Sequence, residues 1–323
     1  MSATRRADGG PSRIVVCGTQ YGVLYLDAVA SLPGAQLCGI VARGSERARW
    51  LAAECDVPLF TTPAEVPPEV DLACVAVGGE AGDALARSFV DRGVHVLQEH
   101  PVSVSHLRDV LARASARGAC FHVNHHFADL PAPAAFVAQV RAARSQAAPL
   151  FGVVVTSQRA SCSALDVAGL ALGAVDLGEI TIASPGGPGP FVVRSALAGV
   201  PFALILQRAG DVDDGRDSVI SHRITVTFPG GDVTLGGAFG PIVTSGDVPG
   251  AARTTRTWTT AGARAPARSA VLQMRVDANR DAIARLLRHA ATGECPDPQR
   301  PEHLVDVADA TARLLDALDG ASR

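Results

Sequence analysis

The tripeptide Glu99-His100-Pro101 is the stretch of this sequence with the clearest capacity for chemistry. It follows the apolar run Val94–Leu97, which predicts a buried strand that ends just before it. An imidazole has an ordinary pKa near neutral pH, so His100 at the end of such a strand is a candidate proton donor. Pro101 restricts the backbone at His100 and would fix its direction. The alternative is that His100 only shapes a pocket.

A second group of polar side chains, Asn124-His125-His126-Phe127, follows the next predicted strand. His126, or a water molecule, is the alternative proton donor, and Asn124 and Phe127 are expected to line a substrate pocket. Adjacent side chains on a strand point to opposite faces, so His125 and His126 are not expected to share a metal ion. The sequence offers no further ligands in a metal-binding pattern. We therefore predict no metal site.

The tripeptide lies within residues 13–123, where short apolar runs alternate with amphipathic stretches, and the second group directly follows this range. Strands that alternate with helices of about 10 residues imply βαβ units with right-handed crossovers. The sequence therefore predicts an α/β chain whose first domain is a Rossmann-like, doubly wound parallel sheet. The predicted strands are 13–17, 36–42, 72–77, 94–98 and 120–123, and the predicted helices are 22–31, 46–55, 81–92 and 106–116.

The turn Cys17-Gly18-Thr19-Gln20-Tyr21-Gly22 joins the first predicted strand to a helix. A dinucleotide pyrophosphate binds at this position, where glycines admit the backbone and the helix N-terminus supplies N–H groups. The spacing departs from G-x-G-x-x-G because the outer glycines are one residue closer, and an ordinary turn is the alternative. Cofactor contacts are expected from Gly18, Thr19, Gln20, Tyr21 and Gly22, from Gly78 after the third main strand, and from Glu99, His100 and Pro101.

The segment Arg43-Gly44-Ser45-Glu46-Arg47 follows the second strand. NAD-binding proteins usually place an acidic residue at this strand tip, where it contacts the ribose hydroxyls. Arg43, Gly44, Ser45 and Arg47 stand here instead, and a guanidinium with a hydroxyl suits a 2′-phosphate. We therefore predict NADPH as the cofactor, with Glu46 placed in the first turn of the next helix. The alternative is a solvated helix start.

After Asn124 the pattern changes to apolar runs joined by turns. Successive hairpins favour an antiparallel sheet, so an α+β second domain with a mostly antiparallel sheet is predicted over 124–323, after a flexible N-terminus at 1–12. Its expected strands are 151–157, 178–183, 202–207, 218–228 and 232–238. Residues 246–269 are expected to form a long loop, which could act as a lid. Helices are expected near 270–292 and 301–318, and the second of these could pack back on the first domain.

The composition is that of a globular protein, with 47% hydrophobic and 19% charged residues. The chain has no lysine, so all 29 basic residues are Arg, and the formal net charge is −3. No basic block suggests nucleic acid. The 7 cysteines form no C-x-x-C pair, which favours a reducing compartment. No segment has the ~20 apolar residues of a membrane helix, and a cytoplasmic location is expected.

Three segments together resemble the Gfo/Idh/MocA oxidoreductase superfamily: the glycine turn, the Glu99-x-Pro101 step, and the change to an antiparallel second domain. Within that superfamily the chain resembles the thiazolinyl imine reductases of siderophore biosynthesis. The resemblance is dense over residues 13–175. The residues that carry it are 17–22 with Tyr25-Leu26, then 39–47 and 98–101, then Val123-Asn124 with 130–132, and finally 163–166 with Gly169 and 171–173.

The resemblance implies reduction of the C=N bond of a thiazoline to a thiazolidine with NADPH, on a substrate tethered to a peptidyl carrier domain of a nonribosomal peptide synthetase. Sugar dehydrogenases of the superfamily carry a catalytic lysine where this chain has His100, and a histidine where it has Leu170, four residues after Asp166. Asp166 would then contact the substrate or cap its helix.

Family members often place a tyrosine at the position of Phe127. The only tyrosines here are Tyr21 and Tyr25, in the glycine segment, so we expect no phenol to supply the proton. A homodimer is expected by analogy. The alternatives are another NADP-dependent oxidoreductase of this superfamily acting on a small carbonyl, or a non-catalytic NADP-binding regulator.

Overall fold

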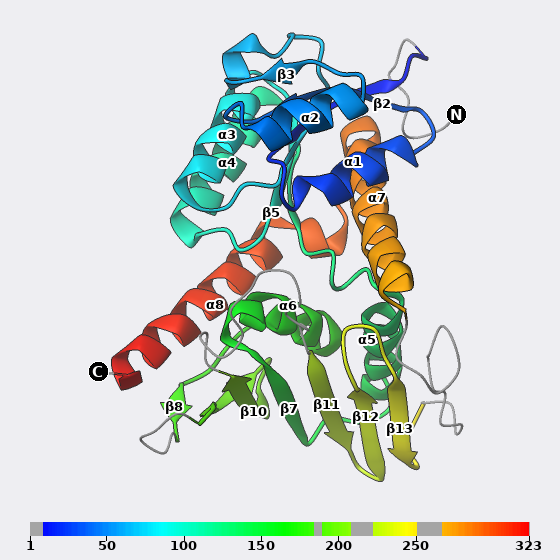
Figure 1. The fold of residues 1–323 in the computed structure, drawn as a ribbon. Coiled ribbons are helices and arrows are strands. Elements are labelled where there is room, and N and C mark those ends of the chain that lie inside the picture. Colours follow the sequence, from blue (N-terminus) through cyan, green and yellow to red (C-terminus); the bar gives the residue numbers. More distant parts are fainter. Residues whose placement is uncertain (1–8, 184–188, 208–221, 251–266, 323) are drawn as a thin grey trace. The chain divides into compact units, whose positions relative to one another are not determined.

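The computed structural model of this chain describes residues 9–183, 189–207, 222–250 and 267–322 (Figure 1). The chain folds into two units, neither of which is continuous in sequence. Unit 1 consists of Met1–His126 and Leu272–Val305, and unit 2 of Phe127–Val271 and Asp306–Arg323. The chain first leaves unit 1 three residues after the boundary expected between residues 123 and 124.

Unit 1 is built on a sheet in which all strands are parallel, in the order β3-β2-β1-β4-β5-β6. The strand order reverses between β1 and β4, and parallel sheets bind ligands beside the carboxyl ends of the strands at such a point. The strands are β1 (Ser12–Cys17), β2 (Ala35–Val41), β3 (Leu59–Phe60), β4 (Leu72–Val75), β5 (His95–Glu99) and β6 (Phe121–Asn124).

Helices cover both faces of this sheet, and for that reason β4 and the last four residues of β1 are apolar and fully buried. The helices of unit 1 are α1 (Gly22–Ala30), α2 (Glu46–Glu54), α3 (Gly79–Asp91), α4 (Val104–Arg117) and α7 (Arg268–Thr292). Ile283 and Leu286 of α7 are fully buried in one core cluster with Tyr25 of α1 and Val16 of β1. Figure 1 shows α7 beside α1.

Unit 2 contains a sheet in the order β13-β12-β11-β7-β10-β9-β8. Neighbouring strands are antiparallel except β7 and β10, which run parallel. The strands are β7 (Phe151–Ser157), β8 (Thr181–Ile182), β9 (Phe191–Leu197), β10 (Val200–Gln207), β11 (Arg223–Phe228), β12 (Gly231–Leu235) and β13 (Ile242–Gly246).

Alternate residues of β7, β10 and β11 are buried, as expected for a sheet with one packed face. This face forms a core with α5 (Pro131–Arg144), α6 (Ser161–Leu172) and α8 (Pro301–Ser322). From α8, Val307, Leu314 and Leu318 join that core. Helix α7 joins the core of unit 1, whereas α8 begins in unit 1 and belongs to unit 2 from Asp306 on.

The structure confirms the predicted fold class: a Rossmann-like parallel sheet followed by a mostly antiparallel one. The prediction did not include β3, β9, β13 or α5. Helix α5 begins with Pro131-Ala132-Pro133, and prolines fit the first turn of a helix because its N–H groups have no helical partner. Most of the expected loop 246–269 lies outside the described residues, and so does the start of the expected strand 218–228.

Among the described residues, no helix is both long enough and apolar enough to cross a bilayer.

The pair His122 and His289 joins β6 to α7 within unit 1. The Nε2 atom of His122 lies 2.9 Å from Nδ1 of His289, and the rings stack with their centroids 5.2 Å apart. Burial, and then the charge of His289, lower the pKa of His122 to about 3. His122 is therefore neutral in the folded protein at neutral pH.

This pair makes unit 1 sensitive to acid. The unfolded chain binds a proton at His122 near the ordinary pKa of about 6.5, so the free energy of unfolding should fall as the pH drops below that value. The loss should be about 1.4 kcal/mol per pH unit for each such histidine. We expect His122→Gln to flatten the dependence of the urea midpoint on pH between 6.5 and 4. An unchanged slope would contradict this. Some slope should remain, because burial also lowers the pKa of His126 to about 3.

Candidate active site and cofactor pocket

A cavity of about 770 Å³ lies at the carboxyl ends of β1, β2 and β4 in unit 1. Gly18 in the turn between β1 and α1 forms part of its wall, with a φ of +94° that favours glycine. A Cβ atom at Gly18 would lie 2.8 Å from the carbonyl oxygen of Ala76 and 2.9 Å from Cγ2 of Val77. The turn therefore needs glycine both for its conformation and for the close approach of neighbouring backbone.

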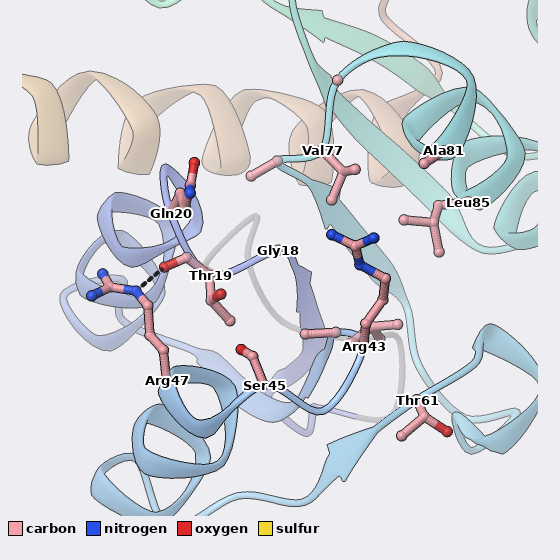
Figure 2. A pocket seen from close by; sticks show the side chains of 14 residues that line it. Gly18, Thr19, Gln20, Arg43, Ser45, Arg47, Thr61, Val77, Ala81 and Leu85 are labelled. Carbon is pink, nitrogen blue, oxygen red and sulfur yellow. Dashed lines mark hydrogen bonds between the residues drawn. The ribbon is translucent and has the colours of Figure 1, made fainter. Parts of the chain in front are cut away.

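The segment after β2 supplies the polar side of this cavity (Figure 2). Arg43 and Ser45 point into the pocket, and Arg47 donates a hydrogen bond from Nε to the carbonyl oxygen of Thr19 at 2.9 Å. Ser45 also caps α2, because its Oγ accepts the N–H of Ala48 at 3.2 Å. Its hydroxyl proton stays available to a ligand. Arg43 is thus directed at the cavity, whereas Arg47 holds the glycine turn.

The remaining predicted cofactor residues divide between this pocket and a neighbouring cluster. Thr19, Gln20 and Gly78 line the cavity, and Gly78 caps the N-terminus of α3. Gly44, with a φ of +75°, lies between the two polar side chains after β2. Thr61, which follows β3, lines the cavity too. Sequence reasoning missed Thr61 because no pattern marked so short a strand.

Glu99 is the centre of a second polar cluster, where β5 and β6 end. Its Oε2 accepts a hydrogen bond from the hydroxyl of Tyr25 at 2.6 Å and one from Nδ2 of Asn124 at 3.1 Å. Its Oε1 lies 3.2 Å from Nδ1 of His100 and 3.7 Å from Nδ1 of His126. These four residues come from α1, from the ends of β5 and β6, and from the turn after β6, so the fold brings the carboxylate its partners.

The charges in this cluster follow from burial and hydrogen bonding. Burial by itself would raise the pKa of Glu99, but the hydrogen bond from His100, the charges of both histidines and the Tyr25 hydroxyl outweigh it and lower that pKa. Burial lowers the pKa of His126 to about 3, against the attraction of Glu99. At neutral pH the cluster therefore contains an ionised Glu99 and a neutral His126.

His100 is held by its Nδ1 atom. This nitrogen lies 2.7 Å from the main-chain oxygen of Asn124, which can only accept, so Nδ1 carries a proton. The side chain of His100 is 12% exposed, and the His100–Pro101 peptide bond is cis. With Nδ1 occupied, the ring atom that can transfer a proton to a substrate is Nε2.

Helix α7 completes the cluster with two residues that sequence reasoning missed. Nδ2 of Asn124 donates to Oδ1 of Asn279 at 2.7 Å and to the hydroxyl of Tyr25 at 2.5 Å. The guanidinium carbon of Arg275 lies 5.2 Å from the centroid of the Tyr21 ring. No motif marks either residue, and more than 150 positions separate Asn279 from Asn124.

His125 and His126 lie past the end of β6, so the expected separation onto opposite strand faces does not apply. Both rings are near that of His100, with centroids 5.5 Å and 5.8 Å away. Ligand atoms of Glu99, His100 and His126 all lie within 4.8 Å of one another and could hold a metal ion. The contacts among these groups account for the same arrangement without an ion.

Two predicted substrate residues, Phe127 and Asp166, belong to unit 2. Phe127 is 4% exposed and packs edge-on against His222, with ring centroids 5.1 Å apart. Asp166 lies within α6 and is 1% exposed. Helix α6 starts at Ser161 with Ala160 as its N-cap, so Asp166 does not cap the helix. Leu170 follows one turn later on the same helix.

Comparison with protein families gives two matches. Residues 12–125 match the family described as "Oxidoreductase family, NAD-binding Rossmann fold", under the name GFO_IDH_MocA. The chain belongs to the Gfo/Idh/MocA oxidoreductase superfamily. Residues 147–245 of this Gfo/Idh/MocA oxidoreductase match "Thiazolinyl imine reductase Irp3-like, C-terminal", which supports membership of the Irp3-like reductase family within it. The cofactor of such a fold is a nicotinamide dinucleotide.

Solved structures share the fold of this Gfo/Idh/MocA oxidoreductase. UDP-N-acetylglucosamine 3-dehydrogenase GnnA from Acidithiobacillus ferrooxidans is 17% identical, with a TM-score of 0.73 and coverage of 97% of this chain and 99% of that one. An Agrobacterium radiobacter oxidoreductase, in complex with NAD+, L-tartaric acid and magnesium, is 15% identical, with a TM-score of 0.72 and coverage of 95% and 96%. Biliverdin reductase from Synechocystis sp. PCC 6803, in complex with biliverdin and NADP+, is 14% identical, with a TM-score of 0.69 and coverage of 95% and 98%. Comparison with curated proteins gives no match.

The glycine turn gives a direct test of the cofactor pocket in this oxidoreductase. Gly18→Ala should weaken binding of a nicotinamide dinucleotide at least ~10-fold, because the new Cβ pushes Ala76 and Val77 away from the turn. Fluorescence titration of the reduced cofactor measures this. Gly118→Ala is the matched control: Gly118 also has a positive φ, of +64°, but nothing lies within 4 Å of its Cβ position and it is not among the residues that line the pocket. Equal affinities in both variants would refute the assignment.

Proposed function

We propose that the protein reduces the C=N bond of a thiazoline, tethered to a carrier protein, to a thiazolidine with NADPH, in siderophore-type nonribosomal peptide biosynthesis. The observation that carries this proposal is the match of residues 147–245 to the C-terminal part of Irp3-like thiazolinyl imine reductases. The polar residues of unit 1 agree with it, because His100 stands where sugar dehydrogenases of the superfamily carry lysine.

The choice of NADPH over NADH rests on the segment after β2. Arg43 and Ser45 face the cavity from the tip of this strand, without an acidic side chain among the cavity-lining residues. A guanidinium supplies several N–H donors to a phosphate, and a serine hydroxyl adds another. Gly18, Thr19 and Gln20, in the turn that leads into α1, form the part of the cavity that suits a pyrophosphate. These residues fit the cofactor, which supplies the hydride when it is bound.

The protein's part in the reaction is to deliver one proton. Hydride addition to the imine carbon leaves negative charge on the ring nitrogen, and the new N–H bond needs a proton at that step. We assign this proton to Nε2 of His100. The ionised Glu99, 3.2 Å from Nδ1, stabilises the imidazolium form that donates it. His126 stays neutral through burial, so it is a weaker candidate.

In unit 1, substrate orientation falls to Asn124. The Oδ1 atom of Asn124 is buried and has no hydrogen-bond partner among the described residues, so it can accept a bond from a ligand. A peptidyl carrier domain is the proposed partner. A homodimer is proposed through the face of the unit 2 sheet opposite its core, where half-buried Val153, Val155 and Ile205 alternate with core residues.

The function is tested by the oxidation of NADPH, followed at 340 nm, with a thiazoline offered as a free thioester and on a carrier domain. Turnover with the thiazoline, faster when it is carrier-bound, is expected. Turnover with sugars or polyols but not with thiazolines would refute the proposal. A protein that binds NADPH tightly and turns over neither class would be a regulator rather than an enzyme.

The proton donor is tested in the same assay with His100→Asn, whose amide can still donate to the Asn124 main-chain oxygen but cannot act as an acid. We expect turnover to fall roughly 10²–10⁴-fold while NADPH affinity changes little. His303→Asn, on α8, is the matched control and should retain turnover. Unchanged turnover in His100→Asn would leave His100 with a role in pocket shape alone.

Cofactor choice is tested separately with Arg43→Ser. Affinity for NADPH should fall roughly 10- to 100-fold because a charge-assisted bond of about 1.5–3 kcal/mol is lost. Affinity for NADH should stay nearly constant. Arg113→Ser removes an arginine that pairs with Asp91 and Asp109 on the surface, and should affect neither cofactor. An equal loss for both cofactors in Arg43→Ser would contradict recognition of the 2′-phosphate.

A further inference from the structure

A guanidinium lies close to the start of α1, where the glycine turn meets the Glu99 cluster. The guanidinium carbon of Arg275, on α7, is 5.2 Å from the centroid of the Tyr21 ring, and Tyr21 immediately precedes α1. Cations are attracted to the face of an aromatic ring. Arg275 therefore has a defined place beside the turn, although the two residues come from distant parts of the chain.

Helix α7 holds the backbone of Arg275 in a fixed position. Asn279, one turn later on the same helix, is fully buried, and its Nδ2 atom donates to the main-chain oxygen of Arg275 at 2.7 Å. Its Oδ1 atom accepts a hydrogen bond from Nδ2 of Asn124, at the end of β6, at 2.7 Å. The guanidinium is therefore carried by a helix tied to the sheet, which suits a binding group better than a loop does.

No acidic group neutralises this guanidinium. Asp277 and Asp281, the acidic residues of α7, pair with Arg280, and no carboxylate of the described residues forms an ion pair with Arg275. Its Nε atom is buried and has no hydrogen-bond partner in that part of the chain. Buried N–H groups are nearly always hydrogen-bonded, so this one calls for a partner. The side chain as a whole is half-buried, so part of it faces solvent.

The charge also has an unfavourable sign for its position. The N-terminus of a helix carries a partial positive charge from its unpaired N–H groups, so anions are stabilised there and cations are not. The first turn of α1 contains no acidic residue that could offset this charge. The guanidinium and the start of α1 thus bring two positive charges close together, and a bound anion would offset both of them.

The anion that a nicotinamide dinucleotide brings to the glycine turn is its diphosphate. Gln20, which lines the cofactor cavity, is the neighbour of Tyr21 in the chain. The positively charged residues that line the cavity, Arg43 and Arg47, both follow β2, and Arg47 already donates to a main-chain oxygen of the turn. Apart from Arg275, the turn offers the diphosphate mainly backbone N–H groups.

We propose that Arg275 binds the diphosphate of the cofactor: its guanidinium donates to phosphate oxygens near the start of α1 and supplies the positive charge for this group. Because NADPH and NADH both contain the diphosphate, Arg275 contributes to the affinity for both, whereas Arg43 is assigned to the 2′-phosphate. The inference rests on the cofactor pocket of the proposed function, and it holds whichever substrate is reduced.

The experiment is a fluorescence titration of the protein with NADPH and with NADH, without substrate. Arg275→Met keeps an apolar side chain against Tyr21 and removes the charge. Both affinities should fall by a similar factor, roughly 10- to 100-fold, as expected for a lost charge-assisted hydrogen bond. Arg280→Met is the matched control, because it removes an arginine of the same helix that pairs with Asp277 and Asp281. Its affinities should stay as in the wild type.

Inorganic pyrophosphate is the probe for the diphosphate itself. It should displace NADH from the wild-type protein, and a roughly 10- to 100-fold higher concentration should be needed with Arg275→Met. Arg275→Lys retains the charge but lacks the forked donors, so it should recover part of the affinity for both cofactors.

The outcomes separate this inference from the proposed function. Wild-type affinities for both cofactors in Arg275→Met would overturn it, and so would equal losses in the Met and Lys variants, because shape rather than charge would then be responsible. Unchanged cofactor affinities with a higher KM for the substrate would assign the anion to the substrate and also overturn it. If thiazolines are not reduced but both affinities fall as expected, the role of Arg275 stands and the substrate assignment fails. If Arg275→Met does not fold, Arg275→Gln is measured in its place.

Discussion

The carboxylate of Glu99 lies where little water can reach it, and unit 1 has to supply the partners that water would otherwise provide. Taking an ionised carboxyl group out of water costs several kcal/mol unless hydrogen bonds replace the lost hydration. Here the donors come from the Tyr25 hydroxyl and the Asn124 amide, with two imidazoles beside the other oxygen. This requirement explains why polar groups from α1, β5 and β6 meet in an otherwise apolar core.

The cofactor pocket and the Glu99 cluster depend on different kinds of interaction. The cofactor pocket depends on backbone shape: Gly18 is needed where any side chain would collide with Ala76, and the helix start beside it needs no particular side chain. The Glu99 cluster depends on hydrogen bonds and charges among its side chains. Substitutions in the pocket should therefore change binding, whereas substitutions in the cluster should change the rate and its pH dependence.

Much of this was accessible from the sequence. Strand and helix positions in residues 13–123 follow from apolar periodicity, because parallel strands are short and buried on both faces. The sequence also places Glu99 at the end of one buried strand, and Arg43 and Ser45 just after another, where the structure has the cluster and the cofactor pocket. The hydroxyl of Tyr21 beside His126, and the contribution of Asn279 and Arg275, do not follow from it. Those contacts depend on the docking of α7 and on side-chain direction, and local patterns encode neither. Helix α5, which begins at Pro131, was not predicted.

Helix α7 also has a consequence for how the protein can be made. Its buried residues belong to the core of the first sheet, and its Asn279 holds the amide of Asn124, yet it is synthesised after most of unit 2. A ribosome must therefore translate past residue 292 before the nucleotide-binding half can close its core. A fragment that stops at the end of the first sheet would lack one of its covering layers. Expression, domain exchange and circular permutation all have to treat the first sheet and α7 as one inseparable piece.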